Sequence, residues 1–163
     1  VGAFERKLLT PSRWDDFLKG KKDALTADEQ KGWETFAKAG CATCHNGPAV
    51  GGAMYQKLGL VKAWPELKDA GRMEATKQES DKHFFKVPSL RNVTETAPYL
   101  HDGSVKTLED MVAKMAEHQL GKTLSNEEVS SIVTFLKALK GDIPKDFIAQ
   151  PKLPESGPNT PKA

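Results

Sequence analysis

Two cysteines and a histidine within five residues are the part of this sequence best able to do chemistry. Cys41 and Cys44 are separated by two residues, and His45 follows directly. On a helical turn, two thiols at this spacing can form thioether bonds to the two vinyl groups of one porphyrin. The adjacent imidazole then lies beneath the iron as its proximal ligand. This Cys-x-x-Cys-His pattern is the attachment signature of c-type haem, so we expect one covalent haem that transfers electrons.

A zinc site and a redox dithiol are the alternatives for this motif. Zinc takes four ligands at recognisable spacing, but the chain has no second cysteine pair and its other histidines are scattered. A redox dithiol has no need of His45. The motif therefore favours haem.

The second axial ligand decides what such a haem does, because methionine ligation raises the reduction potential and suits an electron relay. Met111 and Met115 lie four residues apart on a predicted helix, so both face the same side. Methionines on helices are usually core filler, and spacing alone does not choose between these two. The remaining candidates are Met54, Met73, His83, His101 and His118.

Helices are the elements predicted to position these groups. Thr26 and Glu29 form a capping box that begins a helix ending near Gly40, directly before the motif. The motif itself, Cys41 to His45, should form another helical turn. A short helix is predicted over residues 12–19.

Two more helices follow in the second half of the chain. One begins after Thr107 and carries both Met111 and Met115. The other begins after Ser125 and has apolar residues at spacings of three and four, with Gly141 expected as its left-handed cap. The predicted fold class is therefore all-α.

Long irregular stretches separate these helices. Residues 46–80 show no sustained periodicity, and prolines interrupt residues 81–103. The tail from 144 to 163 contains five prolines and should be extended. We expect an N-terminal helical segment over residues 1–25, a haem domain over 26–143 and the tail over 144–163.

Composition narrows the choice of partners. The 163 residues carry a net charge of +2, with acidic and basic residues interspersed, which argues against a nucleic-acid partner. No stretch is long or apolar enough to span a membrane, and no signal peptide is present. The first residues resemble the middle of a helix, so we expect a mature fragment or part of a longer protein.

Several long motifs resemble bacterial di-haem cytochrome c peroxidases. They are FKVPSLRNVTETAPYLHDGSVKTLEDMVAKMAEHQLG, LSNEEVSSIVTFLKALKGDIP, FERKLLTPSRWDDFLKGKKDALTADEQKGWETF and GCATCHNGPAVGG. The resemblance covers nearly the whole chain and implies a cytochrome c-like C-terminal domain with a high-potential haem. It implies His45 and Met115 as the iron ligands, thereby choosing between the two methionines. It also implies that Trp33 and Phe36 of the first helix pack on the last helix.

The resemblance implies partners as well. These are an N-terminal peroxidatic haem domain, a small cytochrome c or cupredoxin as electron donor, and a second copy in a homodimer, all in the periplasm. A calcium ion between the domains would be bound by the main-chain carbonyls of Thr96 and Pro98. His101 matches a histidine of the haem and domain-interface region, although a locally bonded turn histidine is an equal alternative.

The chain departs from the family pattern because it has one haem motif and no N-terminal haem domain. A stand-alone mono-haem electron carrier is therefore the second hypothesis. A MauG-like enzyme is the third, but its distal tyrosine conflicts with methionine at position 115. Arg91 could bind a haem propionate or be an exposed or interface arginine. Trp14 and Trp64 could be electron conduits, but are more commonly packing anchors.

Overall fold

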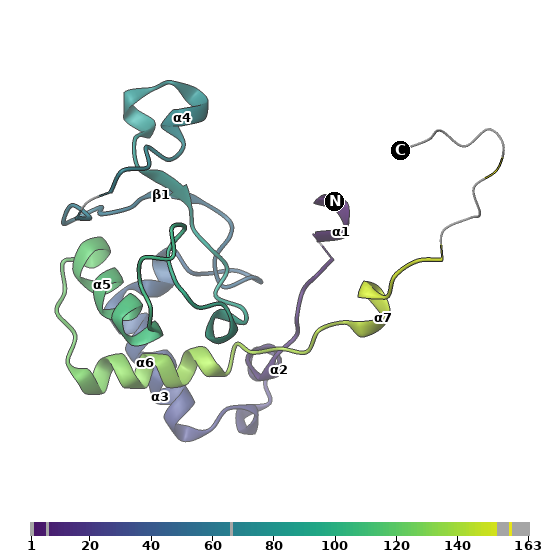
Figure 1. Cartoon of the computed structure of the whole chain (residues 1–163). Coiled ribbons are helices and arrows are strands. Elements are labelled where there is room, and N and C mark those ends of the chain that lie inside the picture. Colours follow the sequence, from purple (N-terminus) through teal and green to yellow (C-terminus); the bar gives the residue numbers. More distant parts are fainter. Residues whose placement is uncertain (1, 6, 66, 153–156, 158–163) are drawn as a thin grey trace. The chain divides into compact units, whose positions relative to one another are not determined.

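The computed structural model describes residues 2–5, 7–65, 67–152 and 157 (Figure 1). The chain forms two units. The larger one spans Thr10–Asp142, and the smaller one combines the described residues of 1–9 with those of 143–163. No helix among the described residues is long and apolar enough to cross a membrane.

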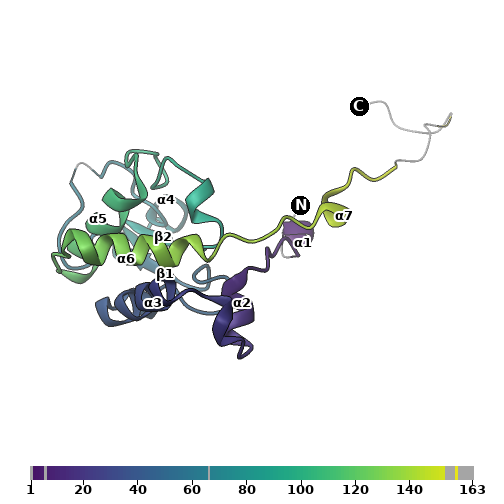
Figure 2. The ribbon, with the colours of Figure 1, turned by 90° about the horizontal axis from the view of Figure 1, so that it is seen from below.

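Two long helices form the framework of the larger unit. Helix α3 (Ala27–Ala39) and helix α6 (Asn126–Lys137) lie side by side (Figure 2). Gly32 permits this close approach, because a Cβ at that position would lie 2.2 Å from the carbonyl oxygen of Ser131. Trp33 and Phe36 each lie with their ring centroids 5.4 Å from that of Phe135, so the two helices pack through aromatic side chains as expected.

The helices begin directly after the capping residues that were predicted from the sequence. The Thr26 hydroxyl accepts a hydrogen bond from the Glu29 amide, and Ser125 does the same for Glu128. Thr107 caps helix α5 (Leu108–Leu120), which packs against α6. Helix α2 (Arg13–Leu18) begins at Ser12 with a capping box and contributes the buried ring of Trp14 to the core. All four helices therefore begin at polar caps.

The loops contain short elements that periodicity did not predict. Strand β1 (Tyr55–Lys57) pairs antiparallel with strand β2 (Phe84–Lys86), with Tyr55 opposite Lys86. Helix α4 (Met73–Thr76) lies between them in the sequence. Single turns of 3-10 helix occupy η1 (Lys22–Ala24), η2 (Cys41–Thr43), η3 (Glu79–Asp81) and η4 (Val93–Glu95).

The expectation that Gly141 ends the last long helix in a left-handed conformation is wrong. Helix α6 ends at Lys137, and Gly141 forms an antiparallel bridge with Ser12. A Cβ on Gly141 would lie 2.3 Å from the carbonyl oxygen of Thr10. This glycine is thus required by close backbone contact with residues 10–12, and not by a helix cap.

The smaller unit contains helix α1 (Gly2–Glu5) and helix α7 (Lys145–Ile148). The rings of Phe4 and Phe147 stack with their centroids 4.9 Å apart. The tail predicted to be extended therefore includes one helical turn, directly after Pro144. Residues 153–156 and 158–163 of that tail lie outside the described residues.

Candidate haem site

A cavity of about 490 Å³ lies in the larger unit, beside the cysteine–histidine motif. Its walls come from three stretches of chain that are far apart in sequence: 40–45, 85–101 and 111–120. Gln56 and Leu58 complete the lining, which is mainly apolar. An enclosure of this kind suits a large apolar group held by a few polar side chains.

The end of α3 places the Cys41–His45 motif at the wall of this cavity. Gly40 adopts φ 105° and turns the chain out of the helix, and the His45 amide then donates to the Cys41 carbonyl oxygen at 3.0 Å. Cys41, Cys44 and His45 all line the cavity, and the two cysteines are not joined to each other by a disulfide. Burial raises the pKa of the Cys41 thiol to about 11, although the nearby charge of Lys122 acts in the opposite direction.

His45 has the properties of a metal ligand. Burial lowers the pKa of its imidazole, while neighbouring backbone groups of Pro88 and Val50 act oppositely. The ring is thereby favoured in the neutral form that can bind a metal. Its buried Nδ1 has no hydrogen-bond partner among the described residues. Gly51 leaves room for this ring, since a Cβ there would lie 3.2 Å from Nδ1 and 2.1 Å from the Pro88 carbonyl oxygen.

Only three of the seven candidate distal ligands line the cavity among the described residues: His101, Met111 and Met115. Met111 also packs against the hydrophobic core, whereas Met115 is not among the side chains packed there. The cavity thus excludes four candidates but accommodates both helical methionines.

The excluded candidates have other surroundings. His118 is buried, with its Nδ1 3.1 Å from the Lys62 carbonyl oxygen and its ring centroid 4.7 Å from that of Trp64. The ring of Trp64 therefore packs against the C-terminal end of α5, as a packing anchor would. Met54 is exposed before β1, Met73 begins α4, and His83 precedes β2.

His101 already has partners at the cavity wall. Its ring stacks on Phe85 with the centroids 4.5 Å apart, and its Nε2 lies 3.3 Å from a carboxylate oxygen of Asp69. The other Asp69 oxygen accepts from the Gly71 amide at 2.7 Å. His101 is therefore at the cavity, as the resemblance implied, and it is also bonded locally.

Arg91 is held away from the cavity by an ion pair. Its guanidinium donates to both carboxylate oxygens of Asp15, at 2.8 and 2.6 Å, and to the carbonyl oxygens of Thr10 and Pro48. These contacts occupy the guanidinium N–H groups that would otherwise bind a haem propionate. Arg91 instead connects residues 10–15 to the loop that follows His45.

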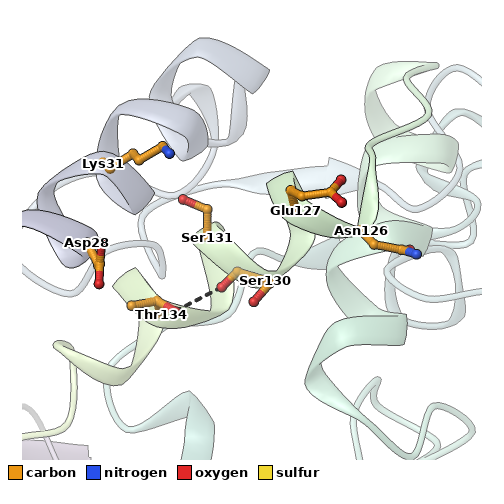
Figure 3. Close-up of a pocket in the computed structure, with 7 residues that line it drawn as sticks. All are labelled: Asp28, Lys31, Asn126, Glu127, Ser130, Ser131 and Thr134. Atoms are coloured by element: carbon orange, nitrogen blue, oxygen red, sulfur yellow. Dashed lines mark hydrogen bonds between the residues drawn. The ribbon is translucent and has the colours of Figure 1, made fainter.

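The calcium prediction concerns main-chain carbonyls and stays a prediction. Thr96 and Pro98, whose carbonyls it names, lie at the cavity lining. The described part of the chain contains no cluster of three or more histidine, cysteine or acidic side chains that could hold a metal ion. A second depression, lined by polar side chains of α3 and α6, contains Asp28, Lys31 and Ser131 (Figure 3). It contains none of the predicted site residues.

Some cavity residues were missed by the sequence reasoning. Phe85 and Tyr99 lie in segments without helical periodicity, and Gln119 looks like an ordinary polar helix residue. The side-chain Oε1 of Gln119 accepts hydrogen bonds from the amides of Gly59 and Leu60 at 2.6 and 3.1 Å, which ties the 57–64 loop to α5. The resemblance to a known family was the one available signal for this region.

The helical unit, its apolar cavity and the two cysteines and imidazole at the cavity wall fit the architecture of a c-type cytochrome domain. Its sequence agrees, because the profile of the cytochrome c family matches residues 29–140. The chain belongs to the cytochrome c family. The predicted cytochrome c-like fold is therefore confirmed, and the family implies a covalently bound haem c.

Full-length relatives extend this result. The chain is 49% identical over 166 residues to cytochrome c551 peroxidase of Nitrosomonas europaea, covering 100% of the chain and 49% of the relative. It is 44% identical over 168 residues to the cytochrome c551 peroxidase of Pseudomonas aeruginosa, covering 99% and 48%. The predicted likeness to cytochrome c peroxidases is confirmed, and the chain spans about half the length of these relatives.

A solved structure gives the same architecture. A MauG-like protein associated with microbial copper homeostasis superposes with a TM-score of 0.66 at 28% identity, over 87% of this chain and 51% of that one. This chain therefore has the fold of about half of that MauG-like protein.

Proposed function

We propose that this chain is the electron-accepting haem domain of a di-haem cytochrome c peroxidase. The proposal is supported by similarity over the whole chain to about half of each cytochrome c551 peroxidase. In the complete protein, a small reduced cytochrome c or cupredoxin would donate an electron to this domain. An N-terminal haem domain would receive it and reduce hydrogen peroxide to water. Location in the periplasm and assembly as a homodimer belong to the same proposal.

The observation that carries this proposal is the cavity that contains both His45 and Met115. Cys41 and Cys44 would tether the porphyrin, His45 would bind the iron on one side and Met115 on the other. We prefer Met115 to Met111 because Met111 packs on the core, and because the family resemblance selects position 115. The bound haem would supply a one-electron carrier of high potential.

The described residues would keep the iron six-coordinate and away from water. Two protein ligands leave no open position for peroxide, and apolar side chains such as Leu90 and Leu100 line the cavity. This domain alone should therefore be a poor peroxidase. Catalysis would belong to the other haem domain.

Replacing the two methionines separately tests the ligand assignment. Met115→Leu in the haem-loaded chain should abolish the six-coordinate low-spin spectrum and lower the reduction potential, because the iron loses a sulfur ligand. Met111→Leu is the matched control one helical turn away, and it should keep both properties. An unchanged spectrum in Met115→Leu, or its loss in Met111→Leu, would contradict the assignment.

A stand-alone mono-haem electron carrier is the second candidate, because the unit Thr10–Asp142 supplies by itself every residue that lines the cavity. Intact mass of the natural protein separates the two possibilities. Two haems on a chain about twice this length indicate the peroxidase, and one haem on a chain of this size indicates the carrier.

The calcium ion remains a separate proposal, with the main-chain carbonyls of Thr96 and Pro98 as ligands. Removing calcium from the complete protein with a chelator should weaken contact between its two haem domains. Domain docking that is indifferent to the chelator would contradict these ligands.

A further inference from the structure

A lysine side chain joins the two segments that carry the proposed iron ligands. Lys122 follows the C-terminal end of α5, and its Nζ donates to the carbonyl oxygen of Ala39 at 2.8 Å. Ala39 is the last residue of α3 and is buried. Cys41 lies two residues further on. One hydrogen bond therefore connects the end of α5 to the end of α3.

The chemistry of the helix end makes this contact favourable. The last carbonyl groups of an α-helix lack partners within the helix, and the helix dipole places partial negative charge there. An ammonium group satisfies both requirements with a charge-assisted hydrogen bond. Lys122 thus acts as a C-terminal cap for α3, although in the sequence it follows α5.

Lys122 is itself fixed relative to α5. Gly121 adopts φ 64°, and the Lys122 amide donates to the Ala116 carbonyl oxygen at 2.9 Å. Beside it, the Leu120 side chain packs against Gly40, where an added Cβ would lie 3.7 Å from a Leu120 methyl carbon. The position of Lys122 is therefore fixed relative to the last turns of α5, which contain Met115.

No other hydrogen bond in the described chain joins α5 or its cap to α3 or to the motif that follows it. The Gln119 side chain bonds to the 57–64 loop instead. Removing Lys122 would therefore leave only apolar contacts to hold these two segments together on this side of the cavity.

We propose that Lys122 is a positioning residue for the distal iron ligand, because it fixes the helix of Met115 relative to the segment of His45. This inference rests on the proposed His45 and Met115 ligation. Without the tether, α5 could move away from the motif and the sulfur would be displaced from the iron more easily. Lys122 itself touches neither the iron nor a substrate.

Competition by an added ligand tests this inference. Imidazole is titrated into the oxidised, haem-loaded chain, and its affinity for the iron is measured by absorbance. Lys122→Met keeps the length of the side chain but removes the donor, and it should bind imidazole about 10-fold more tightly. That factor equals about 1.4 kcal/mol, slightly less than the usual contribution of a hydrogen bond to a charged group. The reduction potential should fall in the same variant.

Three further variants separate positioning from general stability. Lys122→Arg keeps a cationic donor and should restore most of the wild-type affinity. Lys137→Met removes an exposed lysine from α6, and Thr26→Ala removes the cap at the far end of α3. Neither should change imidazole affinity, although Thr26→Ala should lower the midpoint of urea unfolding.

The outcomes distinguish failure of the Lys122 tether from failure of the proposed iron ligation by Met115. If Lys122→Met binds imidazole like the wild type while Met115→Leu binds it much more tightly, the tether is overturned and the ligation stands. If Thr26→Ala raises the affinity as much as Lys122→Met, the effect is one of stability and the tether is again overturned. If Met115→Leu binds imidazole like the wild type, both proposals fail. Should Lys122→Met not fold, Lys122→Leu, which also lacks a donor, is titrated in its place and the same criteria apply.

Discussion

Breaking the ion pair between Arg91 and Asp15 by removing one partner is expected to be among the most destabilising single substitutions in the larger unit. The Arg91 side chain is only 10% exposed and that of Asp15 23%. Four hydrogen bonds from one guanidinium hold residues 10–15 against the loop that follows His45. Arg91→Ala should therefore leave a half-buried carboxylate and two carbonyl oxygens without their donor.

The magnitude follows from breaking one side of such a pair. Removing a single partner of a buried ion pair costs about 3–5 kcal/mol, and the partial exposure of Asp15 places this pair near the lower end, at about 3 kcal/mol. Arg91→Lys keeps the charge but loses the two-pronged geometry, so it should cost about 1–2 kcal/mol. Urea unfolding of the haem-loaded chain at neutral pH measures both values.

The pH dependence supplies a second, independent test. Hydrogen bonds from Arg91 hold the pKa of Asp15 well below its usual range. A carboxyl whose folded-state pKa is depressed stabilises the protein fully above its unfolded value of about 4, and this contribution is lost as the pH falls below it. The difference in unfolding free energy between wild type and Asp15→Asn should thus be constant from pH 7 to about 5 and shrink below about 4. A cost for Arg91→Ala under about 1 kcal/mol, or a difference that stays constant in acid, would refute the reasoning.

Two further predictions concern packing and loop attachment. Gly32→Ala should destabilise the chain by about 2–3 kcal/mol, because its Cβ would meet a backbone oxygen of α6 at 2.2 Å. Gly2→Ala, whose Cβ would meet nothing within 4 Å, should cost less in the same urea experiment, and equal costs would disprove the steric argument. Gln119→Ala should leave the amides of Gly59 and Leu60 without their acceptor, so their hydrogen exchange should become faster while that of α3 stays unchanged. Unaltered exchange at both amides would show that the loop is held by other contacts.

Local signals explain which parts of the fold were predictable. The helices begin at Thr26, Thr107 and Ser125 because a side-chain oxygen can satisfy an unpaired amide within the same turn. The haem motif was predictable for the same reason, since its three groups lie within five residues. Such features need no knowledge of the rest of the chain.

Contacts between distant residues account for what was missed. Strands β1 and β2 have three residues each, too few to show alternation, and they are defined only by pairing with each other. Gly141 looks like a helix cap in the sequence, but its role depends on the backbone of residue 10, far away along the chain. Helical spacing could not separate Met111 from Met115, because both reach the cavity and only packing distinguishes them.

The separation of the cavity walls has a consequence for how the protein matures. The thiols lie in one early segment, whereas the opposite walls are supplied by residues synthesised later, at 85–101 and 111–120. An unfolded chain would therefore present Cys41 and Cys44 to a porphyrin before the rest of the cavity formed. Folding of the later segments would then bury the porphyrin together with its two linkages.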